Sequence, residues 1–504
     1  MSILSQSAKL VARSYAQKFK RWERNAVALQ KQVFSNLLER GARTKFGNDH
    51  KFKAIKSHKD FVDRVPIRDY ENIKPYIDLV IAGQKDILWP GRPKYFAKSS
   101  GTTSGTKYIP ITQDSIPNHI GSARLALLMY IHKTGNTAFV DGKYIFISGS
   151  PVLENSNGIL TGRLSGIVNH HVPWYVKRNQ LPTFKTNCIG DWESKLDSIV
   201  KETIHQGMSI ISGIPPWVEM YFERLLAASG KKTISDIFPN FQLFVYGGVN
   251  FRPYEERFKK LIGRDIGHIE TYPASEGFIA FQDEYPSQGL ILIPDSGIFY
   301  EFVPTDRFDE PNPPRFTLEE VELNKNYAII LSTNAGLWAY SIGDTVRFVS
   351  KNPYRLVVTG RLKHFISAFG EHVIAEEVES ALNEACQKFN AQAIEFTVAP
   401  LVSNPNGLPC HEWFVEFSIP PNDLNEFRLY LDLQMQDKNI YYRDLVNGSI
   451  LQPLIINLMP KGSFVRYMKS IGKLGGQNKV PHLKNDRSIA DELGKYLAAG
   501  GDIS

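Results

Sequence analysis

The chain has little cysteine and no long apolar run. Its three cysteines, Cys188, Cys386 and Cys410, lie far apart and form no CxxC pair. We therefore expect neither a disulfide framework nor a structural zinc site. No apolar run approaches the ~20 residues that a membrane span needs, and basic residues interrupt the N-terminal segment where a signal peptide would have its apolar core. These absences predict a cytoplasmic protein without a membrane span.

Common catalytic signatures are missing too. The sequence has no G-x-S-x-G nucleophile elbow, no H-E-x-x-H, no G-x-G-x-x-G and no kinase catalytic loop. A covalent serine or cysteine mechanism therefore has no support in the sequence. RNP, zinc-finger and basic-zipper patterns are also absent, so we expect no nucleic-acid partner.

The chain does have the length and apolar content for a large folded core. Its 504 residues are 42% hydrophobic and 22% charged, as is usual for a globular protein of two or three domains. The net charge of +7 arises from 59 basic against 52 acidic residues. So small an excess suits a phosphate-bearing ligand as well as it suits nucleic acid.

The most informative stretch spans residues 99–107, which are rich in hydroxyl side chains and glycine and end in Lys107. Glycines let backbone N–H groups turn toward an anion, hydroxyls add donors and the lysine adds charge. Apolar runs on both sides predict a loop between two short strands. The stretch suits a polyphosphate but differs from a Walker A loop, because Thr106 stands where that pattern has glycine. A polar surface linker is the alternative.

The N-terminal segment predicts one long amphipathic helix with a basic outer face. Such a helix can lie on an anionic membrane, but an apolar stripe is usually packed on its own protein, and we favour packing. Apolar residues recur at alternating steps of three and four: Val11, Tyr15, Phe19, Trp22, Ala26, Leu29, Val33 and Leu37.

Strands and helices alternate through the middle of the chain, which predicts α/β layers. We expect a helix around residues 122–132, a buried strand at 144–148 and a helix that begins at Pro215. His170 and His171 fall in an aromatic stretch that predicts a loop. They suggest a metal ion, but no third ligand stands at a fitting spacing, so a pocket wall or plain packing is favoured.

Polar turns follow several predicted strands. A strand at residues 241–246 ends in Gly247 and Gly248, and a strand from residue 268 runs into a turn that contains Glu276. Ligands of α/β sheets bind where strands end in loops. Glu276 can hold a Mg²⁺ that bridges phosphate oxygens, and Asp344 can accept hydrogen bonds from ribose hydroxyls. The alternatives are a helix cap for Glu276 and a turn residue for Asp344.

The last part of the chain predicts a smaller α+β domain. Residues 360–364 are interpreted as a joint, which divides the chain into domains 1–359 and 360–504. A helix is expected over residues 374–385, followed by strands at 394–399 and 413–417.

Several of these features occur in the order and spacing of motifs in a known family. The chain resembles the auxin-responsive Gretchen Hagen acyl-acid–amido synthetases, which belong to the acyl-adenylate-forming superfamily of acyl-CoA synthetases and luciferases. The resemblance spans nearly the whole chain. It rests on residues 99–107, the Gly247-Gly248 turn, Tyr-Pro-Ala-Ser-Glu at 272–276, Tyr-Ser-Ile-Gly-Asp at 340–344, the joint at 360–361 and Gln-Asn-Lys at 477–479.

The resemblance implies an α/β fold with a large N-terminal domain that binds ATP, Mg²⁺ and a carboxylic acid. A smaller, mobile α+β C-terminal domain would close over them. Such an enzyme forms acyl-AMP and pyrophosphate, then passes the acyl group to an amine, usually an amino acid, and releases AMP. The resemblance does not fix the oligomeric state.

The resemblance also implies roles for single residues. Lys479 would be the catalytic lysine of the mobile domain, which neutralises charge between the carboxylate and the α-phosphate. Glu276 would be the second catalytic residue, and its role would be to bind Mg²⁺. Asp344 would hold the ribose with Arg361 nearby, and Tyr272 would stack on the adenine. The remaining ATP contacts would come from Ser99, Ser100, Thr102, Thr103 and Lys107 at the phosphates, and from Gly247 and Gly248 along the adenine and acyl group.

Three positions depart from the family pattern. Ser104 is inserted in the first motif, Ser341 replaces an arginine of the plant members, and His482 follows Pro481 where arginine or lysine is usual. These departures fit a member from outside plants. They leave adenylation in place and weaken the inference that plant hormone acids are the substrates.

Two other functions stay open. The adenylate could pass its acyl group to the thiol of coenzyme A, or the protein could bind a nucleotide without ligase activity. The sequence fixes neither the acid nor the acceptor. The candidate pocket residues His170, His171, Trp174 and Trp217 favour an aromatic or apolar acid.

Overall fold

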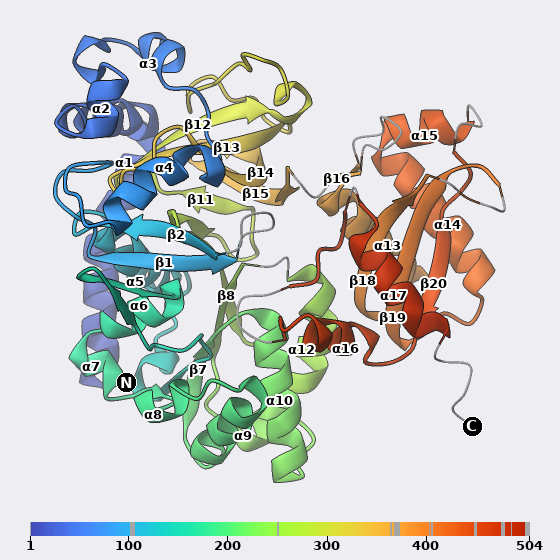
Figure 1. Ribbon diagram of the computed structural model, residues 1–504. Helices are drawn as coiled ribbons and strands as arrows, with labels where there is room; N and C mark the ends of the chain where they lie inside the picture. Colours follow the sequence, from blue (N-terminus) through green and yellow to red (C-terminus); the bar gives the residue numbers. More distant parts are fainter. Residues whose placement is uncertain are drawn as a thin grey trace. The chain divides into compact units, whose positions relative to one another are not determined.

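The computed structural model divides into two compact units. Unit 1 comprises Met1–Ile342 and Val346–Val358, and unit 2 comprises Gly343–Thr345 and Thr359–Ser504. Both contain sheets and helices, which confirms the mixed α/β fold class (Figure 1). The structure describes residues 2–100, 106–248, 251–362, 365–366, 373–402, 404, 407–447, 451–474, 479–484 and 486–498.

An eleven-stranded sheet forms the centre of unit 1. Strands β6, β3, β7, β8 and β9 pair in parallel, whereas β9–β10, β10–β11, β11–β15 and β12–β13 are antiparallel. In spatial order the strands are β12 (Ile298–Pro304), β13 (Asn326–Thr333), β14 (Tyr340–Lys351), β15 (Tyr354–Arg361), β11 (Leu290–Leu292), β10 (Gly277–Gln282), β9 (Gly267–Ala274), β8 (Leu243–Gly247), β7 (Met208–Ser212), β3 (Lys143–Phe146) and β6 (Gln180–Leu181).

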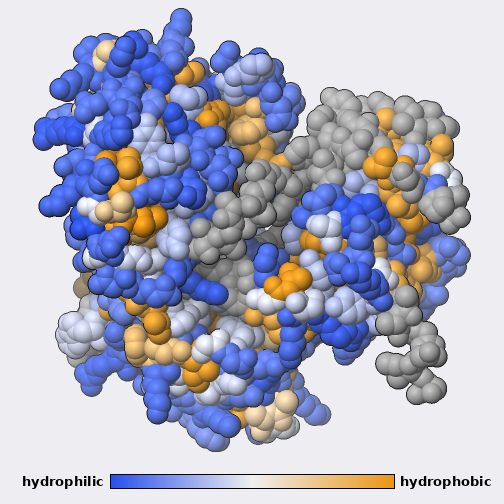
Figure 2. Space-filling model, in the orientation of Figure 1, coloured by the Kyte–Doolittle hydropathy of each residue, from blue (hydrophilic) through white to orange (hydrophobic). Residues whose placement is uncertain are grey.

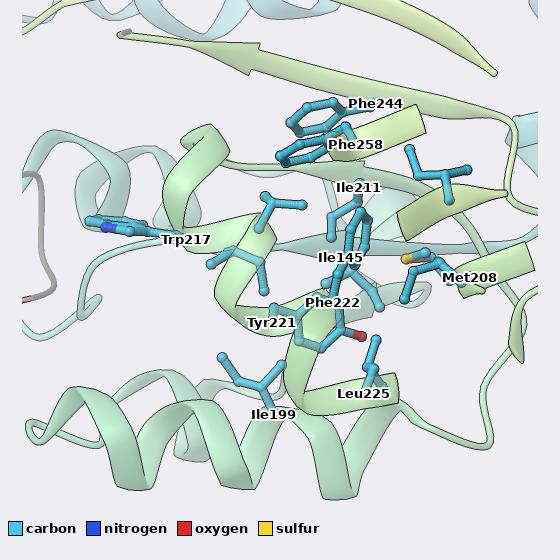
Figure 3. Close-up of a cluster of buried hydrophobic side chains, with 14 of the residues drawn as sticks. Ile145, Ile199, Met208, Ile211, Trp217, Tyr221, Phe222, Leu225, Phe244 and Phe258 are labelled. Carbon is cyan, nitrogen blue, oxygen red and sulfur yellow. The ribbon is translucent and has the colours of Figure 1, made fainter. Parts of the chain in front are cut away.

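Helices cover both faces of the parallel strands. Neighbouring residues of a strand point to opposite faces, and Ile210 and Ile211 of β7 accordingly belong to different buried clusters. Ile211 packs with α9 (Trp192–Thr203), α10 (Pro215–Ser229) and α12 (Arg252–Ile262), as Figure 3 shows in part. Ile210 packs with α1 (Ile3–Gly41) and α5 (Ile116–Thr134). The helices predicted around residues 122–132 and from Pro215 are thus confirmed, as is the strand at β3.

Helix α1 confirms the long N-terminal helix and most of its apolar stripe. Phe19, Trp22 and Leu29 are buried against α5 and the sheet, so packing on the protein itself is confirmed for this part of the stripe. Val11 does not face the core as predicted, because it is 44% exposed whereas Ala12 is 1% exposed. The helix is also kinked at Asn25, where φ is −132° and ψ is 17°.

Trp22 should be a major source of stability in unit 1. It is 1% exposed, and its ring meets those of Phe19 and Phe281 at centroid distances of 5.2 and 6.4 Å. We expect Trp22→Ala to lower the free energy of unfolding by about 3–5 kcal/mol, because a large buried ring leaves a cavity. Urea denaturation followed by circular dichroism measures it. Val11→Ala is the control on the same helix and should change it by less than about 0.5 kcal/mol; equal effects would contradict the packing described.

A second sheet of unit 1 carries the first motif. Strands β1 (Tyr95–Ser100) and β2 (Thr106–Ile111) form an antiparallel pair, and β1 also pairs in parallel with β5 (Ile159–Gly162). Strand β4 (Glu154–Ser156) completes the sheet beside β5.

Unit 2 is built on the three-stranded sheet β18 (Gln392–Leu401), β19 (Cys410–Ile419) and β20 (Ile455–Met459). Helix α13 (Ala375–Lys388) packs on it through Val378, Leu382 and Ala385. The predicted helix, both predicted strands and the α+β character of this part are confirmed. The unit also contains β16 (Phe365–Ile366), β17 (Val373–Ile374), α14 (Leu424–Lys438), α15 (Ile440–Asn447), α16 (Ser463–Ser470) and α17 (Ser488–Ala498).

Unit 1 also contains several shorter helices. Among the helices that the structure describes, none has the length and apolar character needed to cross a bilayer. The face drawn in Figure 2 is mostly hydrophilic, with separate hydrophobic patches. The short helices are α2 (Lys45–Asp49), η1 (Phe52–Ala54), α3 (His58–Arg64), α4 (Tyr70–Ile81), η2 (Ala138–Asp141), α6 (Leu164–His170), α7 (Trp174–Lys177), α8 (Phe184–Asn187), α11 (Ile234–Ile237) and η3 (Thr305–Arg307).

Candidate active site

The first motif lies on the β1–β2 hairpin of unit 1. Ser99 and Ser100 end β1, and in the antiparallel register Ser99 stands opposite Lys107 of β2. The predicted pair of short strands is therefore confirmed. Thr102, Thr103 and Ser104 lie outside the described residues.

Lys107 lies over an aromatic ring. Its Nζ is 5.7 Å from the centre of the Tyr70 ring, and the Tyr70 hydroxyl accepts a hydrogen bond of 2.9 Å from the Tyr108 backbone N–H. A cation over a ring face is attracted by the π-electrons. Tyr70, at the start of α4, therefore helps to fix the direction of the lysine next to the hairpin loop.

The glycine turn ends β8 at the carboxyl edge of the parallel strands. Gly247 stands opposite Thr271 of β9, and a Cβ on Gly247 would collide with the Thr271 carbonyl oxygen. Gly248 has a φ of +80°, which favours glycine. Both glycines are thus required by the close approach and the turn of the backbone.

Glu276 lies in the two-residue turn between β9 and β10, not at a helix N-terminus. The helix-cap alternative is therefore wrong, because Gly277 opposite Ala274 begins the antiparallel strand β10. Glu276 is half-buried in this turn. Tyr272 is 7% exposed and packs in a buried cluster of unit 1; its stacking on adenine stays a prediction.

Asp344 and Arg361 form an ion pair on neighbouring strands. Asp344 lies within β14, so the turn alternative is wrong. The Arg361 Nε donates to Asp344 Oδ1 at 2.7 Å, and the Leu362 N–H donates to the Gly343 carbonyl at 2.7 Å. The Asp344 side chain is 12% exposed and that of Arg361 52% exposed. The ion pair thereby orients the buried carboxylate of Asp344 in unit 2.

Lys479 lies in the same unit, near this ion pair. The residue as a whole is exposed, but burial of its ammonium group lowers the pKa of Lys479 to about 8, the Arg361 charge lowers it further, and Asp344 and Glu379 raise it. The ammonium form of Lys479 therefore predominates at pH 7 and is lost as the pH rises through about 8. The structure thus brings together Asp344, Arg361 and Lys479, which are far apart in sequence.

The candidate pocket residues of unit 1 do not share one environment. Trp217 packs on Trp192 with ring centroids 4.8 Å apart, inside the buried cluster of Figure 3. Trp174 is 75% exposed. The predicted loop is confirmed only for residues 171–173, since His170 ends α6 and Trp174 begins α7. Of the four, His171 contacts Tyr95 of β1, the strand that carries the first motif.

His171 Nε2 is 3.0 Å from the Tyr95 hydroxyl, and His170 Nε2 is 2.8 Å from the Pro151 carbonyl. Burial lowers the pKa of His171, which keeps the ring neutral at pH 7. Across the residues the structure describes, no three His, Cys, Asp or Glu side chains cluster as metal ligands.

Sequence reasoning missed Lys195, a buried lysine of α9. Its Nζ donates to the Ser148 carbonyl at 2.8 Å and the Asn187 carbonyl at 3.0 Å, and burial lowers its pKa to about 8. Ser148 follows the carboxyl end of β3, so Lys195 ties α9 to the edge at which ligands of such sheets bind. A lysine one position before the apolar Leu196 was the available signal.

Sequence reasoning also missed the partners of His482. They are Glu379 of α13 and Glu395 of β18. No local spacing could have paired them with His482, because each is separated from it by more than eighty residues.

Known proteins resemble this chain over most of its length. It is 22% identical to the indole-3-acetic acid-amido synthetase GH3.3 of Arabidopsis thaliana, over 93% of this chain and 91% of that protein. It is 20% identical to the jasmonoyl–L-amino acid synthetase JAR4 of Nicotiana attenuata, over 68% of this chain and 70% of that protein.

Two solved structures share the fold. A GH3.15 acyl acid amido synthetase in complex with 2,4-DB matches with a TM-score of 0.77 and 16% identity, over 97% of this chain and 96% of that one. A 2-hydroxyisobutyryl-CoA ligase matches with a TM-score of 0.58 and 13% identity, over 95% and 92%. These likenesses confirm the adenylate-forming fold.

Three sequence profiles of one family match in chain order. They describe the GH3 family N-terminal domain at residues 15–183, its central domain at 290–361 and its C-terminal domain at 376–488. GH3 stands for Gretchen Hagen, so the resemblance inferred from the motifs is confirmed. The chain belongs to the GH3 family.

Proposed function

We propose that the protein is an ATP- and Mg²⁺-dependent ligase that activates a carboxylic acid as acyl-AMP and transfers the acyl group to an amine, with an amino acid as the acceptor. The observation that carries the proposal is the match to relatives named amido synthetases over 93% of this chain. Unit 1 is assigned the binding of ATP and acid. Unit 2 is assigned the role of a lid that brings Lys479 to the reacting atoms.

The first half-reaction forms one bond and breaks another at the α-phosphorus. A carboxylate oxygen of the acid attacks it, and the bond to the β-phosphate breaks with release of pyrophosphate. Negative charge crowds between carboxylate and phosphate, and the Lys479 ammonium neutralises it. Asp344 accepts hydrogen bonds from the ribose, with its orientation set by Arg361.

Magnesium fits the assigned site by its donor chemistry. A half-buried carboxylate, Glu276, stands in the turn after β9, beside the strand end at Gly247. Mg²⁺ is usually held by one or two carboxylates together with substrate phosphates. When bound, it would neutralise charge on the phosphate oxygens. Ser99, Ser100, Thr102, Thr103 and Lys107 are assigned the remaining phosphate contacts.

In the second half-reaction the amine attacks the acyl carbon, the bond to the AMP oxygen breaks, and the nitrogen loses a proton. Adenylation makes this step possible because AMP leaves far more readily than oxide from a free carboxylate. The backbone of Gly247 and Gly248 is assigned the contacts along the adenine and the acyl group at this edge. We also propose a cytoplasmic location, in line with the free cysteines.

The thiol of coenzyme A is the second candidate acceptor. It is favoured by the shared fold with a 2-hydroxyisobutyryl-CoA ligase. Both acceptors use the same adenylate, so they differ only in the second half-reaction.

An exchange assay tests the proposal. The full-length protein is incubated with ATP, Mg²⁺, labelled pyrophosphate and a panel of carboxylic acids, and label returning to ATP is counted. We expect exchange that depends on at least one added acid, followed by an amide product with an amino acid. A thioester without amide would favour the second candidate. Tight ATP binding without exchange for any acid would contradict both and leave a nucleotide-binding protein.

A further inference from the structure

His482 is held between two carboxylates of unit 2. Its Nδ1 is 2.7 Å from Glu379 Oε1 on α13, and its Nε2 is 2.9 Å from Glu395 Oε1 on β18. A carboxylate only accepts hydrogen bonds, so both ring nitrogens must donate. The geometry therefore requires the imidazolium form, which joins α13 to β18.

The bridge is shielded from water. The side chains of His482, Glu379 and Glu395 are 16, 12 and 19% exposed, and the His482 ring stacks on Phe396 at 4.3 Å. Burial alone would lower the pKa of His482, but the hydrogen bonds and charges of the two carboxylates outweigh it and raise the pKa to about 10. The bridge therefore persists at neutral pH.

The segment that contains His482 also runs along β18 through its backbone. The Val398 N–H donates to the His482 carbonyl at 2.9 Å, and the Lys484 N–H donates to the Val398 carbonyl at 3.0 Å. The Thr397 hydroxyl donates to the Pro481 carbonyl at 2.6 Å. The ion bridge and these bonds hold the segment at one register beside the strand.

Lys479 is three residues before His482, and Glu379 acts on both. The carboxylate of Glu379 raises the pKa of Lys479 and accepts a hydrogen bond from His482. The bridge thus fixes the backbone position from which the Lys479 side chain extends. It also uses the same Glu379 carboxylate that stabilises the positive charge of Lys479.

We propose that His482 is the positioning residue for Lys479: bridging Glu379 and Glu395, it anchors the segment from which the lysine reaches the reacting atoms. The role given to Lys479 rests on the proposed function, whereas the bridge itself does not.

Two substitutions separate positioning from folding. His482→Gln is neutral and cannot donate to both carboxylates from opposite sides, whereas His482→Arg keeps a cation with donors in a planar fork. In the acid-dependent exchange of pyrophosphate into ATP, we expect His482→Gln to lower kcat by about tenfold or more, with roughly unchanged KM for ATP and acid. His482→Arg should restore most of the rate. Lys484→Gln, which removes an exposed ion pair with Asp486 in the same segment, should leave it unchanged.

The pH profile gives an independent readout. Among the residues that the structure describes, the charged groups that act on Lys479 are Arg361 of β15, Asp344 of β14 and Glu379 of α13. His482→Gln leaves Glu379 without its imidazolium partner and so favours the ammonium form of Lys479. The pKa of Lys479, measured by competitive acetylation and mass spectrometry, should move upward in His482→Gln and stay near the wild-type value in His482→Arg.

Hydrogen exchange tests the bridge without any assay of activity. We expect the amides of Val398 and Lys484 to be protected in the wild type and in His482→Arg, and to lose protection in His482→Gln. Unchanged protection and unchanged kcat in His482→Gln would overturn the proposal. A loss of folded protein with normal kcat per active site would also overturn it, since the role would then be structural only. If the wild type showed no ATP–pyrophosphate exchange with any acid, the proposed function would fail. Protection of the amides from hydrogen exchange would still show whether the His482 bridge forms.

Discussion

Replacing Lys479 by alanine is expected to lower the rate of acyl-adenylate formation by about 10²–10³-fold, the usual cost of losing one group that stabilises transition-state charge. The ammonium acts only while charge crowds between carboxylate and α-phosphate, so the affinity for ATP should change little. Single-turnover formation of pyrophosphate measures the rate, and equilibrium titration with ATP measures the binding.

A matched control and a pH series sharpen this result. Lys484→Ala removes a lysine of the same segment that pairs with Asp486, and it should leave adenylation intact. Because the pKa of Lys479 is lowered to about 8, the charged form dominates below that pH, and the wild-type rate should fall as pH rises through it. Lys479→Arg should not show this fall. Adenylation indifferent to Lys479→Ala would contradict the mechanism assigned here.

Replacing Glu276 by glutamine is the second large effect we expect. The amide keeps the size of the side chain but removes the negative charge that would hold Mg²⁺ with the phosphates. The rate at low Mg²⁺ should fall by about 10²-fold, a typical effect of losing a charge-stabilising group, and rising Mg²⁺ concentration should recover part of it. Exchange rates over a Mg²⁺ titration measure both effects.

Glu284→Gln is the control for this substitution. Glu284 follows the other end of β10 and pairs with Lys133 and Arg355, so its loss affects two ion pairs away from the β9–β10 turn. It should leave the Mg²⁺ dependence as in the wild type. The same Mg²⁺ dependence in Glu276→Gln and the wild type would argue against Glu276 as the magnesium residue.

Periodicity predicted the elements well where one strong signal decided them. The alternating helix and strand runs identified α5, α10, α13, β18 and β19. At the start of α1, periodicity predicted the wrong residue for the buried face. Ala12, not Val11, faces the core, and one residue turns a side chain by about 100° around a helix. Only packing partners, here on α5, select the face.

Sequence could not predict the environment of single aromatic residues. The sequence predicts both Trp174 and Trp217 as pocket residues, but Trp174 is 75% exposed and Trp217 packs on Trp192 in the core. Both types of environment suit a tryptophan, and the choice depends on elements that are distant in sequence. The same limit hid the partners of His482 on α13 and β18.

The motif order supplied what local chemistry could not. Glu276 and Asp344 taken alone were equally compatible with a cap and a turn, and the structure excludes both readings. The resemblance assigns Asp344, Arg361 and Lys479 to one ATP site, and the structure places the three residues in one unit. Their roles in binding ATP and in catalysis stay predictions until they are measured.

The transfer of oxygen from the acid to AMP tests adenylation most directly. The acid found in the exchange assay is labelled with ¹⁸O in its carboxylate and supplied with ATP, Mg²⁺ and the acceptor, and the products are examined by mass spectrometry. Attack of the carboxylate on the α-phosphorus, followed by cleavage of the acyl–oxygen bond, predicts one ¹⁸O in each AMP and none in pyrophosphate. Unlabelled AMP, or ADP with labelled phosphate, would contradict an acyl-AMP intermediate.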